Sequence, residues 1–273
     1  MRSPQPQTDE QSAKKGWWTR RLDPDRSLGL RLTLASVAAV LVLVPFSVLS
    51  LLVISAWWPL RSVDEGLAES LHAEAVANPG WTSAMQIWTD VFGPGPLRLL
   101  VLAVVIWLWW RGARRVALWA VTTMVAGGLL GAGLKLLFGR GRPELLDPVE
   151  HAAGYSFPSG HALTAALAAG VLVLVFLPFV REIGEARRRR TARWGIWAAA
   201  LAVTAVTGLS RIALGVHWLS DVLGGWVLGG AVVAATTAAF ATWRGRVGHR
   251  LGDPLTEGVD EEEEVRSARD GQA

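Results

Sequence analysis

Long apolar blocks separated by short polar stretches dominate this chain, and they constrain its fold more than any other feature. About 20 consecutive apolar residues are needed to cross the hydrocarbon core of a bilayer as a helix. Several blocks reach or approach that length. Hydrophobic residues occupy 51% of the 273 positions, and the mean hydropathy is positive. We therefore expect an all-α, polytopic membrane protein rather than a soluble domain.

The apolar blocks predict six transmembrane helices between two polar tails. The expected spans cover residues 30–58, 96–110, 116–138, 161–180, 194–214 and 218–243. Because the second span is short, its outer end either recruits part of residues 81–93 or leaves that amphipathic stretch in the interface. The domain plan is a tail over 1–27, a six-helix membrane domain over 28–245 and an acidic tail over 246–273. We expect the acidic tail to be disordered.

The distribution of lysine and arginine predicts how the chain is oriented in the plasma membrane. Basic residues crowd the N-terminal tail and the connections between spans two and three and between spans four and five. The connection between spans one and two is instead acidic. The positive-inside rule then places both termini in the cytoplasm. The connections after spans one, three and five face outward.

Several other properties follow from composition. The formal charge is +4, but the basic residues form no stripe, so we expect no nucleic-acid partner. The absence of cysteine excludes disulfides and thiol chemistry. The first apolar run is far longer than the 7–15 residues of a signal-peptide core, so it is interpreted as an uncleaved helix. Gly127 with Gly131, and Gly225 with Gly229, have the small-xxx-small spacing of helix contacts.

The first of three polar clusters with potential chemistry runs from Lys135 to Pro143, at the outer end of the third span. Lys135 and Arg142 are seven residues apart, which puts them on one face if the helix persists. Pro143 disfavours helix at the residue before it and marks the expected end. The alternative is a pair of cations that snorkel at a helix terminus.

The second cluster, Tyr155-Ser-Phe-Pro-Ser-Gly-His161, opens the fourth span. The free backbone N–H groups and the positive dipole end of a helix form an anion-binding site. Ser159, Gly160 and His161 would stand at that end. The alternative is an ordinary N-cap, with Ser159 as the capping residue and His161 as a bystander.

The third cluster, from Ser210 and Arg211 through His217 to Asp221, bridges the fifth and sixth spans. His217 and Asp221 are four residues apart and would be neighbours on a helix. An aspartate bonded to one ring nitrogen fixes the histidine tautomer and orients the other nitrogen toward a substrate. The alternative is a satisfied His–Asp pair that only ties two helices together.

Together the clusters predict one outward-facing pocket suited to phosphoryl transfer. Phosphoryl transfer spreads negative charge over three oxygens, and positioning plus electrostatics supply most of its catalysis. The pocket would hold three cations, a helix N-terminus, two histidines and a single carboxylate. Because it has no group of several carboxylates, we expect neither a metal nor another cofactor. The two histidines can then serve as the nucleophile and the leaving-group acid.

The three motifs Lys135-x6-Arg142-Pro143, Pro158-Ser159-Gly160-His161 and Ser210-Arg211-x5-His217-x3-Asp221 resemble those of the type 2 phosphatidic acid phosphatase superfamily. That superfamily includes bacterial lipid phosphatases, glucose-6-phosphatase and vanadium haloperoxidases. The resemblance implies a helix-bundle phosphatase core in which His217 attacks phosphorus, Asp221 orients it and His161 protonates the leaving oxygen. It implies phosphate binding by Lys135, Arg142, Ser159, Gly160 and Arg211. Arg140 lies outside the motif and is assigned no role.

The resemblance also implies a lipid phosphate or diphosphate substrate that is reached from the bilayer. An outward-facing site suits recycling of the isoprenoid carrier, so undecaprenyl diphosphate is the expected substrate. Phosphatidylglycerol phosphate and phosphatidic acid are the alternatives. A non-enzymatic lipid-binding or transporter-like protein on the same fold is a further alternative. It would be marked by loss of a catalytic histidine, and both His161 and His217 are present.

Overall fold

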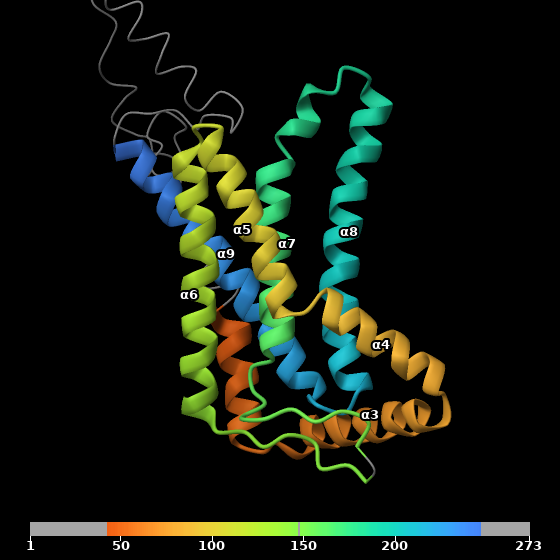
Figure 1. Ribbon diagram of the computed structural model, residues 1–273. Coiled ribbons are helices and arrows are strands. Elements are labelled where there is room, and N and C mark those ends of the chain that lie inside the picture. The colour runs from red at the N-terminus through yellow and green to blue at the C-terminus, as the bar shows by residue number, and fades with distance from the viewer. Residues whose placement is uncertain (1–42, 147, 247–273) are drawn as a thin grey trace, which may run out of the picture.

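The computed structural model describes residues 43–146 and 148–246, and within them every regular element is a helix (Figure 1). After a helical segment over Leu43–Ile54, the elements are α3 (Trp58–Ala77), α4 (Pro79–Val91), α5 (Pro94–Trp110), α6 (Arg114–Phe138), α7 (Gly160–Phe176), the 3-10 turn η1 (Phe179–Glu182), α8 (Ala186–Ala213) and α9 (Leu219–Arg246). The predicted tail 1–27, the start of the first predicted span and residues 247–273 lie outside the described residues.

The expectation of an all-α, multi-pass membrane protein is confirmed. Five helical units are long and apolar enough to cross a membrane, and the segment Leu43–Ile54 with α3 would make a sixth. That pair is bent by 84°. Predicted spans three to six coincide with α6, α7, α8 and α9. The first of the five units, Pro79–Trp110, joins α4 to α5, so by length and composition the preceding stretch continues the short second span as one candidate span.

Large apolar side chains cover the outside of the helices. Leu129, Leu136 and Leu201 each expose at least 70% of their surface, and Trp110 exposes 82%. Soluble proteins rarely expose contiguous apolar surface on this scale. Bilayer hydrocarbon solvates such side chains, and the helices satisfy their own backbone hydrogen bonds there.

Helix α7 is the centre of the bundle and packs against α5, α6, α8 and α9. Glycines allow these close contacts. A Cβ atom added at Gly127 or Gly131 would lie within 2.4 Å of a leucine on α7. Gly225 and Gly229 on α9 are equally tight against α7. Both predicted small-xxx-small pairs are therefore confirmed as packing positions.

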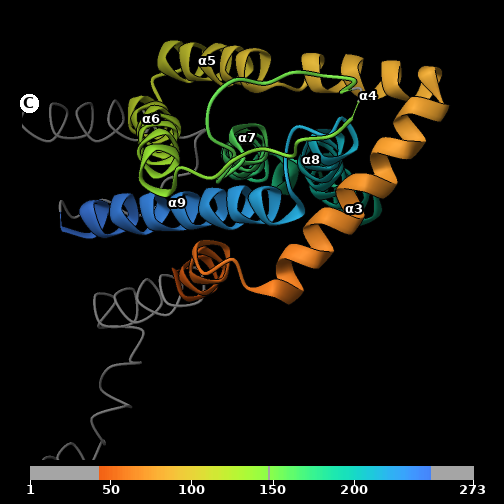
Figure 2. The same cartoon turned by 90° about the horizontal axis from the view of Figure 1, so that it is seen from below.

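One end of the bundle is closed by α3, α4 and the connection 139–159 (Figures 1 and 2). The arginine-rich α5–α6 and α7–α8 connections lie at the other end (Figure 1). The acidic stretch interpreted from the sequence as a connection is the 20-residue helix α3. Its alanines Ala68 and Ala75 are buried, and it packs against α8 and α9. Contacts with α8 and α9 therefore bury one side of a helix whose charged residues alone would predict an exposed segment.

The first cluster departs from one expectation. Helix α6 ends at Phe138, and Gly139 follows in the left-handed conformation with φ of 58°. A residue without a Cβ adopts that conformation at no steric cost, so Gly139 is the helix stop. Lys135 therefore lies in the last helical turn and Arg142 in the following loop. The two do not share a helix face, and Pro143 is not the residue that ends the helix.

Candidate active site

The second cluster forms the N-terminus of α7, as predicted. Ser159 is the N-cap, and its hydroxyl accepts a hydrogen bond from the Ala162 N–H at 3.5 Å. Gly160 is the first helical residue, and His161 stands in the first turn. The Ser159 N–H donates to the backbone oxygen of Asp221 at 2.9 Å. This bond fixes the second motif against the third.

His217 and Asp221 are in contact, but through a cap rather than a shared helical turn. Helix α8 ends at Ala213 and α9 begins at Leu219, so His217 lies in the loop between them. Asp221 Oδ2 accepts from the Trp218 N–H at 3.0 Å, as in half of a capping box. The same oxygen lies 3.2 Å from His217 Nδ1. The predicted contact between His217 and Asp221 is therefore present, and the first turn of α9 orients it.

The surroundings of His217 fix its tautomer. Its Nε2 lies 3.3 Å from Arg142 Nη1, and a guanidinium can only donate, so Nε2 must accept. The proton is then on Nδ1, which donates to Asp221. Burial lowers the pKa of His217 to about 4, against the opposing effect of Asp221 and with the help of nearby Arg142. At neutral pH His217 is therefore a neutral imidazole with its Nε2 lone pair toward the pocket.

The cations of the first motif reach the other two motifs across the connection 139–159. Lys135 Nζ donates to the Tyr155 carbonyl at 2.7 Å. The Lys135 stem lies against the N-terminus of α7, since a Cβ added at Gly160 would be 3.9 Å from its Cε. Arg142 Nη1 donates to the Val216 carbonyl at 2.6 Å, directly before His217. Both cations thus border the space between the two helix starts.

Arg211, in the last turn of α8, is almost fully buried and incompletely satisfied. Its Nη2 pairs with Glu150 Oε1 at 2.6 Å, and Nη1 donates to Thr89 Oγ1 at 3.2 Å. Its Nε is buried and has no hydrogen-bond partner among the described residues. One donor of the guanidinium is therefore left without an acceptor among the described residues, and the Glu150 carboxylate balances its charge.

His161 completes the group. Its imidazole interacts electrostatically with Arg211, His217, Lys135 and Arg142. On the other side, a Cβ added at Gly93 between α4 and α5 would lie 3.7 Å from His161 Nε2. All eight predicted site residues thus lie at the same end of the bundle, on four elements and the loops between them.

Two histidines and several donors therefore lie together at this end of the bundle, and groups of these kinds can bind a phosphate ester. Lys135, Arg142 and Arg211 supply positive charge, and the α7 N-terminus supplies backbone N–H groups. In the part of the chain that the structure describes, no three His, Asp or Glu side chains converge as a metal site would require. Side chains of these types are able to supply a nitrogen nucleophile and a general acid.

Sequence reasoning missed three charged residues of this region. Arg140 contacts Asp221 and also Asp64 on α3, and Glu150 pairs with Arg211. Only Arg140 lies inside a recognised cluster. Asp64 lies on α3, in a stretch that the sequence assigned to a connection, and Glu150 lies in the connection before α7. The apolar pattern does not predict the folded course of either segment.

A comparison with protein-family models matches residues 116–244 to the PAP2 superfamily. The match starts in α6 and ends in α9, so it contains all three motifs. The segment of residues 116–244 belongs to the PAP2 superfamily. The resemblance found from the motifs is thereby confirmed for the family, while the role of each residue stays a prediction.

Curated PAP2 relatives and one solved structure are similar to this chain. Phosphatidylglycerophosphatase B of Bacillus subtilis (strain 168) is 33% identical over 101 residues, which cover 37% of this chain and 46% of the relative. Lipid A 1-phosphatase of Rhizobium etli is 30% identical over 148 residues, which cover 51% and 54%. The chain thus spans about half the length of the curated relatives it matches.

The solved structure is that of a transmembrane PAP2-type phosphatidylglycerolphosphate phosphatase from Bacillus subtilis. It aligns with a TM-score of 0.63 and 22% identity, over 76% of this chain and 96% of that one. This likeness establishes the transmembrane PAP2 fold.

Proposed function

We propose that the protein is a membrane lipid phosphatase that works through a phosphohistidine intermediate on His217. The observation that carries the proposal is the state of His217. Asp221 holds its Nδ1 proton, and its Nε2 lone pair faces the cationic pocket 3.3 Å from Arg142 Nη1. A ring held only as a structural tie would not need its second nitrogen directed at a cation.

The reaction has two displacements at phosphorus. His217 Nε2 attacks, the bond from phosphorus to the lipid oxygen breaks, and protonated His161 gives its proton to that leaving oxygen. Neutral His161 next removes a proton from water, whose oxygen attacks the phosphohistidine. The P–N bond breaks, inorganic phosphate leaves, and the electron pair returns to Nε2. With a diphosphate substrate, the first leaving group is the lipid monophosphate.

The binding residues act on the charge that develops in these steps. Lys135, Arg142 and Arg211 would hold the equatorial oxygens of the transferring group, with the backbone at Ser159 and Gly160. Donors fixed before the reaction stabilise the transition state without reorganisation, and a water-poor site strengthens them. Asp221 keeps the Nδ1 proton in place and stabilises the positive charge that the attacking ring acquires.

The substrate is proposed to be undecaprenyl diphosphate, because basic connections at the opposite end of the bundle favour an outward-facing site. A second candidate is phosphatidylglycerol phosphate, which the names of one relative and of the similar structure favour. In phosphatidylglycerol phosphate the phosphate to be removed is bonded to a lipid oxygen, and in undecaprenyl diphosphate it is bonded to a lipid phosphate. The proposed orientation has both termini in the cytoplasm.

The test is phosphate release by purified protein in detergent, with undecaprenyl diphosphate, phosphatidylglycerol phosphate and phosphatidic acid offered separately in EDTA. We expect release from at least one lipid and none from His217→Ala. Acid-labile, base-stable radiolabel on the wild-type protein would mark a phosphohistidine. Hydrolysis that EDTA stops and magnesium restores would refute the metal-independent scheme. A folded wild-type protein that hydrolyses no lipid would favour the non-enzymatic alternative.

A further inference from the structure

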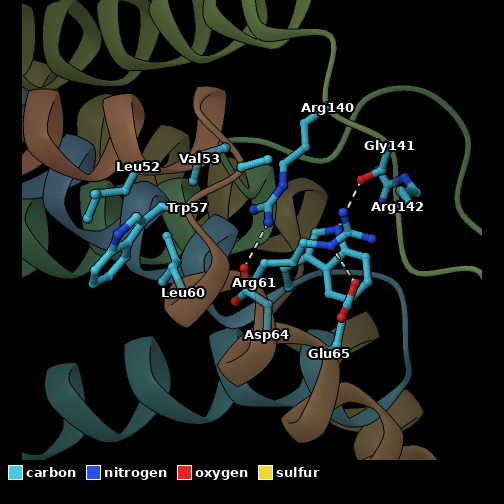
Figure 3. Close-up of a pocket in the computed structure, with 12 residues that line it drawn as sticks. Leu52, Val53, Trp57, Leu60, Arg61, Asp64, Glu65, Arg140, Gly141 and Arg142 are labelled. Atoms are coloured by element: carbon cyan, nitrogen blue, oxygen red, sulfur yellow. Dashed lines mark hydrogen bonds and ion pairs between the residues drawn. The ribbon is translucent and has the colours of Figure 1, made fainter.

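A partly buried arginine bridges two buried aspartates beside the candidate site. Arg140 Nη1 lies 2.6 Å from Asp221 Oδ1, and its Nη2 lies 2.8 Å from Asp64 Oδ2. The Asp221 side chain is fully buried, the Asp64 side chain is 1% exposed and the Arg140 side chain 19%. Figure 3 shows the guanidinium above Asp64. One side chain from the connection after α6 thus joins α3 to α9.

Asp64 also contacts the start of α9 directly. Its Oδ1 accepts from the Ser220 N–H at 2.9 Å, and its Oδ2 accepts from the Ser220 hydroxyl at 2.5 Å. A carboxylate at a helix N-terminus satisfies free N–H groups and interacts favourably with the helix dipole. Asp64 therefore fixes the first turn of α9, the turn that carries Asp221.

The two oxygens of Asp221 are divided between two tasks. Oδ1 is bonded to Arg140, whereas Oδ2 accepts from the Trp218 N–H and from His217 Nδ1. The Arg140 guanidinium lies 5.6 Å above the Trp218 ring, and Trp218 Nε1 donates to the Gly141 carbonyl at 3.0 Å. These contacts leave the carboxylate one orientation, with Oδ2 toward His217.

We propose that Arg140 is a positioning residue for the phosphohistidine reaction and that Asp64 holds it in place; this inference rests on the proposed function. Arg140 acts through Asp221 and does not touch the phosphate. It gives the buried carboxylate a counter-charge, since an unpaired buried charge would be strongly disfavoured. Without it, two buried carboxylates would face each other, and Asp221 would no longer fix the Nδ1 proton of His217.

The alternative is a clamp that stabilises the fold and leaves catalysis unchanged. Kinetics separate the two roles, because a positioning residue changes kcat while the phosphate-binding groups set KM and vanadate affinity. Lysine is a useful replacement, since an ammonium keeps the charge but cannot offer two parallel N–H groups to two carboxylates.

A neighbouring ion pair provides the matched control. Arg61 and Glu65 lie on α3 on either side of Asp64 in the sequence and line the same pocket of about 340 Å³ as Arg140 (Figure 3). Their side chains are 62% and 43% exposed, at a distance of 2.7 Å. An exposed pair contributes little, so Arg61→Gln should leave kcat, KM and melting temperature unchanged.

The experiment compares wild type, His217→Ala, Arg140→Gln, Arg140→Lys, Arg61→Gln and Arg140→Gln/Asp64→Asn in detergent. Undecaprenyl diphosphate, phosphatidylglycerol phosphate and phosphatidic acid are offered to wild type, and the variants are measured on the lipid that wild type hydrolyses fastest. We expect Arg140→Gln to lower kcat on the order of 100-fold, with KM and the vanadate inhibition constant within about twofold, and Arg140→Lys to fall between. The added Asp64→Asn removes the unpaired carboxylate and should restore part of the lost kcat.

The outcomes that overturn the inference are distinct from failure of the proposed function. Inactive wild type, or active His217→Ala, refutes the proposed function itself. If wild type is active, and Arg140→Gln melts at a lower temperature but keeps its kcat, then Arg140 is only a structural clamp. A raised KM at unchanged kcat would make Arg140 a phosphate ligand. If Arg140→Gln does not fold, a wild-type kcat in Arg140→Lys overturns the inference instead.

Discussion

The contact between α7 and α9 at Gly225 allows a sharp test of how closely the site depends on helix packing. Gly225 lies one turn beyond Asp221 on α9 and faces the start of α7. A Cβ added there would be 2.7 Å from the Ser159 carbonyl oxygen and 2.9 Å from the Ala162 Cβ. Gly225→Ala therefore presses on the residue whose N–H bonds the Asp221 backbone at 2.9 Å.

The size of the effect follows from these distances. Carbon atoms pack best at about 3.5–4.0 Å, so α9 must move away from α7 by about 1 Å near the site. Overpacking of this kind costs about 1–3 kcal/mol, offset by about 0.5–1 kcal/mol because alanine favours helix over glycine. A displacement of about 1 Å between catalytic groups lowers the rate on the order of 100-fold.

Melting temperature and kcat/KM of Gly225→Ala measure the two effects, with Gly230→Ala as the control. A Cβ at Gly230 meets nothing within 4 Å, and this residue is exposed on the same helix. We expect Gly225→Ala to melt earlier and lose about 100-fold in kcat/KM, whereas Gly230→Ala matches or slightly exceeds wild type. Wild-type activity and stability in Gly225→Ala would refute the reasoning, and equal losses in both variants would remove the contact as their cause.

Three further predictions follow from the site. Burial lowers the pKa of His217 from its ordinary value of 6.5 to about 4. We therefore expect kcat/KM to fall as the pH drops through about 4, and to show no ionisation of His217 near 6.5. A pH–rate profile of wild type with an ionisation at 6.5, assigned to His217 by its NMR titration, would contradict this. Between those two values the unfolded chain binds the proton and the native protein does not, so this group makes unfolding easier as the pH falls. Glu150→Gln should release Arg211 from its ion pair and lower the vanadate inhibition constant several-fold. Glu144 is exposed in the same loop, so Glu144→Gln should leave that constant unchanged. Weaker vanadate binding in Glu150→Gln would mean that Glu150 orients Arg211 rather than competing with the anion. His161→Ala should slow hydrolysis of alkyl phosphates far more than that of aryl phosphates such as p-nitrophenyl phosphate, whose leaving group needs no proton. Equal losses of rate on both substrates would show that His161 is not the general acid.

The membrane helices could be predicted from the sequence because the bilayer requires long apolar blocks whatever the tertiary contacts are. The start of α7 was equally accessible, since Ser159 has the residue type and position of an N-cap. The end of α6 was expected too late, at Pro143, although Gly139 carries the usual signal for a helix stop. The contact of His217 with Asp221 was predicted from helical spacing and is made by a cap instead.

Long-range charge pairs were beyond the reach of the sequence pattern. Asp64 and Arg140 are 76 positions apart, and the acidic stretch around Asp64 has the composition of a solvated connection. Glu150 has an equally ordinary place in the connection before α7. Periodicity describes which face of an element is apolar, whereas a pair between two elements depends on how they cross. Such pairs follow only from the folded chain.

The electrostatics of the end of the bundle explain why a further arginine is needed there. In the proposed phosphate-binding site, Lys135, Arg142 and Arg211 must keep their charge available for the substrate. The Asp221 carboxylate is buried at the same end of the bundle and needs a counter-charge of its own. If the substrate cations supplied it, phosphate would have to displace Asp221 at every turnover. Arg140 supplies this charge from the opposite side, on Oδ1, so that Oδ2 stays with His217 whether or not phosphate is bound.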